Sequence, residues 1–406
     1  MDTGDTAWVL MSAAMVMLMT PALGFFYGGL VQRKNVLSTI MHSVFILALI
    51  SVQWVLWGYS LAFSPGSAFI GGFEWIGLRG VGMEPNPDYS ATIPHNLFMA
   101  YQMMFAVITP ALITGAFAER KRFKAMVVFS LLWATFVYEP VAHWVWAVGG
   151  WLRDYGALDF AGGTVVHITS GVSALVAAMV LGKRIGFGKH AYEPHNITYT
   201  VLGAGLLWFG WFGFNAGSAL GANGLAANAF VVTNTAAAMA SLSWLTISWI
   251  RHGRPSVLGA AAGAVSGLVA ITPAAGYVSA TSAIIIGFLA GILCFFAVDL
   301  LKKIIKIDDA LDVFAVHGVG GIVGAIATGF FAEVAINPAG FNGLFFGNPE
   351  QVVKQIVAVA VVAGYSAVVT FIILKVVDVT VGLRVPEQEE VLGLDTTTHG
   401  EAAYQL

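Results

Sequence analysis

Two histidines stand inside apolar stretches of this sequence, where an ionisable side chain is unusual. His167 occurs in Thr-Val-Val-His-Ile and His317 in Ala-Val-His-Gly-Val. A polar group in apolar surroundings is costly unless it meets a partner or a water-filled cavity, so both positions are candidates for function. Each one alone is more often a buried structural histidine. Two neutral imidazoles in contact would satisfy each other and leave two ring nitrogens facing a pore.

An aspartate precedes each histidine, at Asp159 and at Asp312. At the helical rise of ~1.5 Å per residue, His167 lies about 12 Å from Asp159, while His317 lies about 7 to 8 Å from Asp312 on the opposite side of the membrane. The two histidines can therefore reach the same depth. Both aspartates also stand where helices are expected to begin, so capping of free backbone N–H groups is the competing interpretation. Asp159 can in addition attract a cation at long range.

Aromatic side chains gather at the ends of two apolar stretches. One reads His143-Trp-Val-Trp146, and the other reads Trp208-Phe-Gly-Trp-Phe-Gly-Phe-Asn-Ala-Gly-Ser218. An aromatic ring attracts a small cation through its quadrupole, and the Ser218 hydroxyl accepts a hydrogen bond. The pattern fits a receptor for a small ammonium-type cation, although the pattern alone does not favour this interpretation. A belt of aromatic residues at the membrane interface is the alternative.

The elements that position these residues are membrane-spanning helices. Of the 406 residues 58% are hydrophobic and only 10% are charged, which excludes an ordinary soluble globule. Runs of about 20 apolar residues, long enough to cross a bilayer, recur along the chain. The sequence predicts an all-α polytopic membrane protein with eleven transmembrane helices, over residues 6–30, 36–63, 93–118, 125–146, 162–181, 197–219, 227–250, 257–275, 281–301, 313–332 and 352–378.

The distribution of basic residues predicts the orientation of these helices. With the N-terminus outside and the C-terminus inside, all of the 19 Lys and Arg residues except Arg79, Arg153 and Lys354 fall on the inside. An odd number of spans fits two inverted five-helix repeats plus one extra helix, an arrangement common among transporters. We therefore expect a membrane domain over residues 1–383 and a cytoplasmic tail over residues 384–406, which is polar, acidic and too short for a core of its own.

The same residues argue against catalysis and metal binding. Cys294 is the single cysteine and lies in an apolar run, so neither a disulfide nor a cysteine-based metal site is expected. The zinc-protease pattern His-Glu-x-x-His does not occur. We predict that the protein is not an enzyme and has no cofactor and no metal, with one alternative left open, a membrane haem protein in which His167 and His317 are axial ligands.

Four motifs together resemble the ammonium transporter family, which includes the methylammonium permeases and the Rhesus proteins. They are Asp159-Phe-Ala-Gly-Gly-Thr-Val-Val-His167, Trp211-Phe-Gly-Phe-Asn-Ala-Gly-Ser218, Asp312-Val-Phe-Ala-Val-His317-Gly-Val-Gly-Gly and Gly382-Leu-Arg-Val-Pro-Glu. The resemblance runs from about residue 6 to the end of the chain and is to the bacterial or archaeal branch. It implies recruitment of ammonium at an outer aromatic site, its deprotonation, and conduction of ammonia through an apolar pore, with separate proton transfer left open.

The resemblance also implies roles for individual residues. The twin pore histidines correspond to His167 and His317, the gate to Phe105 and Phe214, the recruitment site to Trp146 and Ser218 with Asp159 behind it, and Trp211 to the pore lining. The stretch from Trp146 to Trp151 matches the family's Trp-Gly-Gly pattern only with a small shift, so Trp144 and Trp151 remain alternatives to Trp146.

Partners and location follow from the same resemblance. It implies a homotrimer in the inner (plasma) membrane, surrounded by lipid bilayer, that takes ammonium or ammonia with methylammonium as an analogue. It further implies a P-II nitrogen signalling protein at the cytoplasmic face, and no nucleic acid. The alternative within the family is an ammonium sensor that signals through its tail.

Overall fold

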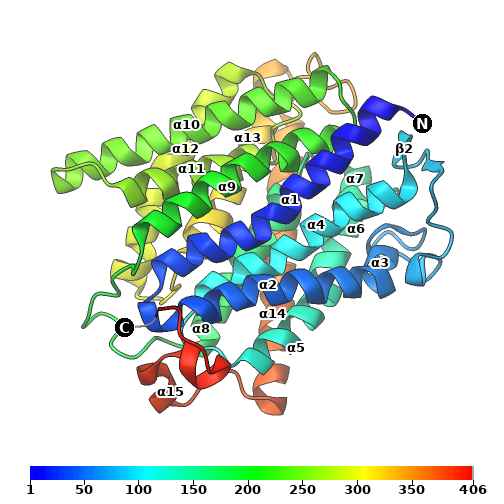
Figure 1. Ribbon diagram of the computed structural model, residues 1–406. Helices are drawn as coiled ribbons and strands as arrows, with labels where there is room; N and C mark the ends of the chain where they lie inside the picture. The colour runs from blue at the N-terminus through cyan, green and yellow to red at the C-terminus, as the bar shows by residue number, and fades with distance from the viewer. Residues whose placement is uncertain (405–406) are drawn as a thin grey trace.

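The computed structural model describes residues 1–404, and it is a bundle of long helices with a small two-stranded sheet at one end (Figure 1). Ten helical segments are long and apolar enough to cross a membrane, and α11 is a shorter apolar helix. The prediction of an all-α multi-pass membrane protein is confirmed in this form. Residues 405 and 406 of the expected tail lie outside the described part of the chain.

The helices and strands have the following bounds: α1 Thr3–Leu30, α2 Val36–Gln53, α3 Tyr59–Phe63, β1 Pro85–Asn86, β2 Ser90–Pro94, α4 His95–Ile113, α5 Phe123–Trp133, α6 Glu139–Trp146, α7 Trp151–Tyr155, α8 Thr169–Leu181, α9 Ile197–Ala216, α10 Gly224–His252, α11 Val257–Ile271, α12 Ala280–Asp299, α13 Val319–Phe331, α14 Glu350–Thr380 and α15 Glu387–Leu392. Strands β1 and β2 pair antiparallel.

Several predicted spans are not uniform α-helices. Wider π-helical turns join α2 to α3 and α5 to α6, and others precede α8 and α13, over Trp54–Gly58, Ala134–Tyr138, Gly163–Ile168 and Phe314–Gly318. The predicted span 257–275 is too long, because α11 ends at Ile271 and Pro273, which has no backbone N–H, follows in a turn.

Small residues let the helices approach closely where lipid provides no hydrophobic drive for association. A Cβ on Gly203 of α9 would lie 2.4 Å from the backbone nitrogen of Phe26 in α1. Likewise a Cβ on Gly171 of α8 would lie 2.2 Å from the backbone nitrogen of Gly318. This second contact holds the turn that carries His317 against the helix that follows His167.

The two ends of the bundle are different surfaces, and Figure 1 shows the chain termini at opposite ends. We call the end with Asp2, strand β2 and Trp146 the N-terminal face, because the Asp2 backbone N–H donates to the Thr92 carbonyl there. The other end, with the loops near Lys34 and Arg184 and with helix α15, is the C-terminal face.

Candidate functional site

Three cavities follow one another between the two faces. The first, at the N-terminal face, has a volume of about 410 Å³ and is lined by Trp146, Asp159, Ser218 and Phe105, among others. The second is a narrow space of about 10 Å³ bounded by Phe214, Trp211, His167 and His317. The third, of about 540 Å³, is lined by His317 and Asp312. His317 thus separates the second cavity from the third.

The first cavity places an aromatic ring beside a hydroxyl group. Trp146 ends α6, and its indole N–H donates to the Asp159 carbonyl at 3.0 Å. The Ser218 hydroxyl donates to the Phe214 carbonyl at 2.8 Å, which leaves its lone pairs for a donor in the cavity. The Tyr101 hydroxyl lies 3.2 Å from Ser218 Oγ and also bonds the Gly213 and Phe214 carbonyls.

The two alternative tryptophans lie elsewhere. The Trp144 indole N–H donates to the Phe69 carbonyl at 2.7 Å, and its ring packs 4.6 Å from that of Tyr365. Trp151 packs against Trp144 with ring centroids 5.9 Å apart. Within residues 1–404, only Trp146 of these three lines the first cavity.

Asp159 is buried and caps a helix. Its carboxylate accepts hydrogen bonds from the backbone N–H groups of Gly162 at 2.7 Å, Gly163 at 2.6 Å and Thr164 at 2.7 Å, and from the Thr164 hydroxyl. The capping predicted for Asp159 is confirmed. Burial raises the pKa of Asp159, and these hydrogen bonds oppose that rise.

The capping predicted for Asp312 is wrong. Its carboxylate pairs with the Lys302 ammonium at 2.7 Å, and its backbone is left-handed with φ 62°. Asp309 caps the turn instead, because its Oδ2 accepts from the Phe314 backbone N–H at 2.7 Å. Burial, and next the charge of Asp312, raise the pKa of Asp309 to about 6. Helical spacing could not predict that Asp309 is the cap, because the chain makes a turn between Asp309 and Asp312.

Two phenylalanines divide the first cavity from the second. The rings of Phe105 in α4 and Phe214 in α9 lie 4.2 Å apart between centroids at an angle of 31°. Phe105 also meets the edge of Trp146 at 5.9 Å. Trp211 stacks on His167 at 5.4 Å, and its indole N–H is held by the Thr272 hydroxyl at 2.9 Å.

The two histidines are in contact. His167 Nδ1 lies 3.2 Å from His317 Nδ1, with the rings nearly parallel at 21°. Each histidine lies in a π-helical turn, Gly163–Ile168 and Phe314–Gly318. The Nε2 atom of His167 is buried and has no hydrogen-bond partner among the described residues. A buried nitrogen without a partner next to a narrow cavity is available to a molecule that passes through it.

The geometry does not fit a haem between these histidines. Their facing nitrogens are within hydrogen-bonding distance, so no porphyrin plane fits between the rings. No cluster of three or more His, Cys, Asp or Glu side chains that would hold a metal ion is present in residues 1–404.

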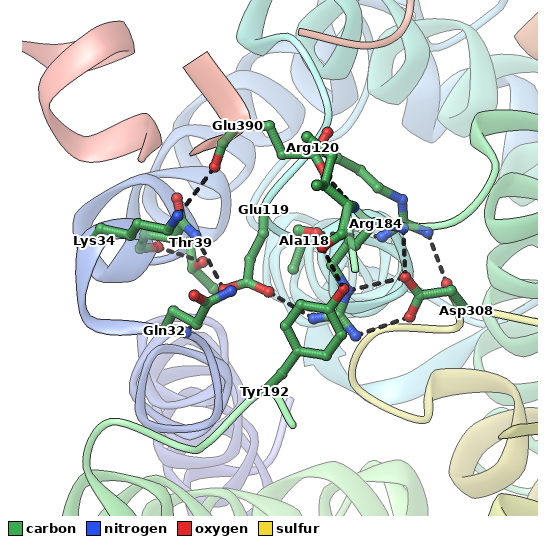
Figure 2. Close-up of polar contacts among 12 residues, drawn as sticks. Gln32, Lys34, Thr39, Ala118, Glu119, Arg120, Arg184, Tyr192, Asp308 and Glu390 are labelled. Carbon is green, nitrogen blue, oxygen red and sulfur yellow. Dashed lines mark hydrogen bonds and ion pairs between the residues drawn. The ribbon is translucent and has the colours of Figure 1, made fainter. Parts of the chain in front are cut away.

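The C-terminal face is organised around a buried guanidinium group (Figure 2). Arg184 pairs with Glu119 at 2.6 Å and with Asp308 at 2.8 Å, and Tyr192 covers it at 3.9 Å. Burial alone would lower the pKa of Arg184, but the two carboxylates outweigh it and raise that pKa. Burial would likewise raise the pKa of Asp308, but its bonds with Arg184 lower it.

The described part of the tail, residues 384–404, is attached to this face. Arg384 pairs with Glu390 at 2.8 Å, and the Glu390 carboxylate accepts from the Ile185 backbone N–H at 2.8 Å. Asp395 accepts from the backbone N–H groups of Leu37 at 3.1 Å and Ser38 at 2.8 Å. The tail therefore lacks a core of its own but is ordered by polar contacts with the membrane domain.

Sequence reasoning missed three parts of this arrangement. Tyr101, whose hydroxyl contacts Ser218, was not among the predicted site residues. Asp309 was overlooked although it stands eight residues before His317, the same separation as Asp159 from His167. The network around Arg184 joins loops far apart in the chain, and no local pattern indicates it.

The fold and the cavities define the class of protein, a multi-pass helical membrane protein with an interior passage lined by aromatic and histidine side chains. The model of the Ammonium Transporter Family matches residues 7–404. The chain therefore belongs to that family, as the sequence resemblance implied.

Characterised relatives and solved structures agree with this assignment. The chain is 56% identical to the ammonium transporter of Bacillus subtilis over 100% of this chain and 99% of the relative. It is 51% identical to the ammonium transporter Amt1 of Archaeoglobus fulgidus over the full length of both. The crystal structure of Candida albicans Mep2 superposes with a TM-score of 0.90 at 39% identity, covering 96% of this chain and 88% of the other.

Proposed function

We propose that this protein transports ammonium across a membrane by binding it at the N-terminal face, removing a proton and conducting ammonia past the histidine pair. One observation carries the proposal: an aromatic and hydroxyl-lined cavity leads through two stacked phenylalanines to a narrow space bounded by two histidines in contact. Family membership supports the same substrate.

Recruitment takes place in the first cavity. The Trp146 ring attracts ammonium through its quadrupole, and the Ser218 oxygen accepts one of its N–H groups because the Ser218 hydrogen is directed to the Phe214 carbonyl. Asp159 lies behind this site with its carboxylate engaged by backbone N–H groups. It therefore acts on the cation at a distance and not as a direct ligand.

Selectivity arises after recruitment. Ammonium and potassium have the same charge, so a cation site alone separates them weakly. An apolar passage as narrow as the one beyond Phe105 and Phe214 excludes a charged ion, whereas neutral ammonia passes. Deprotonation near the two phenylalanines is available to ammonium and not to potassium, and it supplies the discrimination.

The histidine pair serves the ammonia and its proton. His167, Trp211 and His317 line the narrow space together, and the His167 Nε2 atom, which has no partner in residues 1–404, is available to form a hydrogen bond with ammonia there. Water in the first cavity accepts the proton from ammonium, and the facing Nδ1 atoms provide the route by which this proton crosses the pair. Transport of ammonia together with this proton carries charge.

We further propose that the N-terminal face is outside and the C-terminal face is cytoplasmic, in the inner (plasma) membrane. The clustering of Arg120, Arg184 and Arg384 on the C-terminal face supports this orientation. A cysteine replacing Met83, which is 75% exposed, should react with an impermeant reagent from outside, and one replacing Lys189 should not. The reverse labelling pattern would refute the orientation.

Two inverted five-helix repeats are proposed with a corrected register. Asp159 and Asp309 each cap the backbone N–H five residues later and each precede a pore histidine by eight residues. Asp309, not Asp312, is therefore the counterpart of Asp159. Superposing the two halves in opposite orientation tests this pairing, which fails if His167 and His317 do not coincide.

We propose a homotrimer whose cytoplasmic face, including the tail from residue 384, binds a P-II nitrogen signalling protein. The ordered attachment of Glu390 and Asp395 beside the loops of that face supports a shared docking surface. Truncation after Leu383 should abolish P-II binding measured by co-elution with purified trimer. Unchanged co-elution would remove the tail from this proposal.

The function is tested with purified protein in liposomes. An ammonium concentration jump should give an electrical current that saturates with concentration and no rise of internal pH, because each ammonia enters together with one proton. A pH change without current would retain ammonia conduction and refute charged transport. Neither signal, with ammonium binding intact, would favour the second candidate.

That second candidate is an ammonium sensor. It is favoured by one comparison, because a structure described as a sensor Amt protein superposes with a TM-score of 0.89 at 30% identity, covering 97% of this chain and 98% of that one. The tail, which is attached to the loops with Lys34 and Ile185 and to the start of α2 at Ser38, would be the part that reports occupancy of the passage.

A further inference from the structure

Two π-helical turns meet in the bundle away from the three cavities. One, Trp54–Gly58, follows α2, and the other, Ala134–Tyr138, joins α5 to α6. The Trp57 indole N–H donates to the Thr135 hydroxyl at 3.1 Å, so the turns are in direct contact. π turns occur often at functional sites, and neither of these two carries a residue of the passage.

A polar clamp spans the second of these turns. The Gln53 side-chain amide donates to the Thr135 hydroxyl at 3.4 Å and to the Glu139 carboxylate through a short hydrogen bond. Thr135 and Glu139 are four residues apart at the two ends of the turn. Gln53 therefore holds both ends of the wide turn from a neighbouring helix.

A buried carboxyl group without a basic partner destabilises a membrane-spanning segment, and the clamp contains such a group. Glu139 is fully buried, and in residues 1–404 no basic side chain pairs with it. Its Oε2 has no hydrogen-bond partner there either. A Cβ on Gly58 would lie 2.6 Å from Glu139 Oε1 and 2.9 Å from Gln53 Oε1, so only glycine leaves room for this pair. An intramembrane carboxyl group of this kind is expected to have a function.

The turn determines the direction of the Trp146 ring. A π turn contains one more residue than an α turn, so its relaxation would rotate the helix that follows by about 100° and shift it by about 1.5 Å. The helix that follows is α6, which has 8 residues, begins at Glu139 and ends at Trp146. Any change in the turn is therefore transmitted over two helical turns to the first cavity.

We propose that Gln53 and Glu139 are positioning residues for cation recruitment: they fix the π turn before α6 and thereby aim the Trp146 ring into the first cavity. This inference rests on the proposed recruitment of ammonium at Trp146. His143 supports the other end of α6, because its two ring nitrogens contact the Ala62 and Ser67 carbonyls at 2.9 and 2.8 Å. The two attachments together define the rotation of a short helix.

The test is saturable uptake of labelled methylammonium into liposomes that hold equal amounts of folded oligomer. Glu139→Leu and Gln53→Leu should each raise the KM roughly threefold to tenfold, because they weaken a cation–π contact and leave the passage intact, while Vmax stays within about twofold. Glu139→Gln keeps an oxygen acceptor for Gln53 and should restore the normal KM. Tyr138→Phe, in the same turn, serves as the matched control, because it removes a hydroxyl that has no hydrogen-bond partner among the described residues.

A double-mutant cycle with Trp146→Leu separates positioning from general instability. If Glu139 acts through Trp146, Glu139→Leu should raise the KM no further in the Trp146→Leu background. Additive effects, or a fall of Vmax alone in both leucine variants, would overturn the inference. If Trp146→Leu leaves the KM unchanged, the recruitment proposal fails. If Trp146→Leu raises the KM but Glu139→Leu and Gln53→Leu leave it normal, only the positioning role is refuted.

Discussion

Replacing His317 with leucine removes one half of the histidine contact at nearly constant volume. Within residues 1–404, His167 Nε2 has no hydrogen-bond partner, and His167 Nδ1 has only His317 Nδ1, at 3.2 Å. His317→Leu therefore strands both nitrogens of His167 beside a cavity of about 10 Å³, which holds one water at most. The loss of a partner for a buried polar atom destabilises the protein by about 1–3 kcal/mol.

The reverse replacement should destabilise the protein less. His317 also lines the cavity of about 540 Å³, where water can reach its ring after His167→Leu. We therefore expect a lower thermal midpoint for His317→Leu than for His167→Leu. Equal midpoints would contradict the assignment of the narrow cavity to the His167 side.

Both leucine variants should assemble and yet lose the ammonium-driven current, while leakage of neutral ammonia persists. Current and internal pH are recorded in liposomes with equal amounts of folded oligomer. His42→Leu is the matched control. His42 is a buried histidine of α2 that lies outside the three cavities, and its ring nitrogens have no hydrogen-bond partner in the described part of the chain. Native currents in both pore variants would refute the proton route through the pair.

A carboxylate in the same position tests selectivity. His167→Glu places a group that can be anionic in the narrow space, where it would stabilise a cation that the neutral pair excludes. Potassium current should then appear beside the ammonium current. Potassium exclusion that survives this change would show that selectivity is complete before the histidines, at the phenylalanines.

Three other perturbations follow from the geometry. Trp146→Leu combined with Ser218→Ala should raise the KM for methylammonium roughly ten- to a hundredfold. The double variant loses a cation–π contact of about 0.5–2 kcal/mol and a hydrogen bond of about 1 kcal/mol. Uptake that is lowered equally at all concentrations would indicate a pore defect instead. Asp309 has a raised pKa of about 6, so its contribution to stability is present below the unfolded pKa near 4 and is lost as pH rises through 6. The thermal midpoint of Asp309→Asn relative to that of the native protein should therefore be higher at pH 8 than at pH 4.5. The same difference in midpoint at both pH values would contradict the raised pKa of Asp309. Arg184→Met strands two buried carboxylates and should cost about 3–5 kcal/mol of unfolding free energy, whereas Arg251→Met at an exposed ion pair should cost less than about 1 kcal/mol; similar losses would refute the burial argument.

The sequence is sufficient to predict which segments are helices and how deep a residue lies in the membrane. Runs of apolar residues locate the helices, and helical rise from Asp159 brings His167 to the depth of His317. The sequence does not predict the direction in which a side chain points around the helix axis. Each π turn adds a residue without changing composition, so spacing alone cannot tell whether Trp144 or Trp146 faces the first cavity. The structure answers this because Trp146 lines the first cavity and Trp144 does not.

The exchange of Asp312 for Asp309 has a similar cause. Both aspartates precede the same helix, and the choice between them depends on a left-handed residue at Asp312 that no helical pattern encodes. The contacts of Arg184 with Glu119 and Asp308 join three loops that are distant in the chain. Such contacts depend on how the spans pack, which a single sequence does not give.

The π turns connect these points to function. A uniform α-helix directs residues by a fixed rotation of about 100° each, so a span made of one helix has its ring directions set from end to end. The extra residue of a π turn changes this rotation locally, so side chains before and after the turn no longer have directions fixed relative to each other. His167 and His317 stand within two such turns, and α6 with Trp146 follows a third. The turn before α6 is held by Gln53, whereas the turn with His317 is held against Gly171, where a side chain would lie 2.2 Å from the Gly318 backbone. These two turns are thus contacted from different helices, and the directions of Trp146 and His317 depend on how α2 and α8 pack against them.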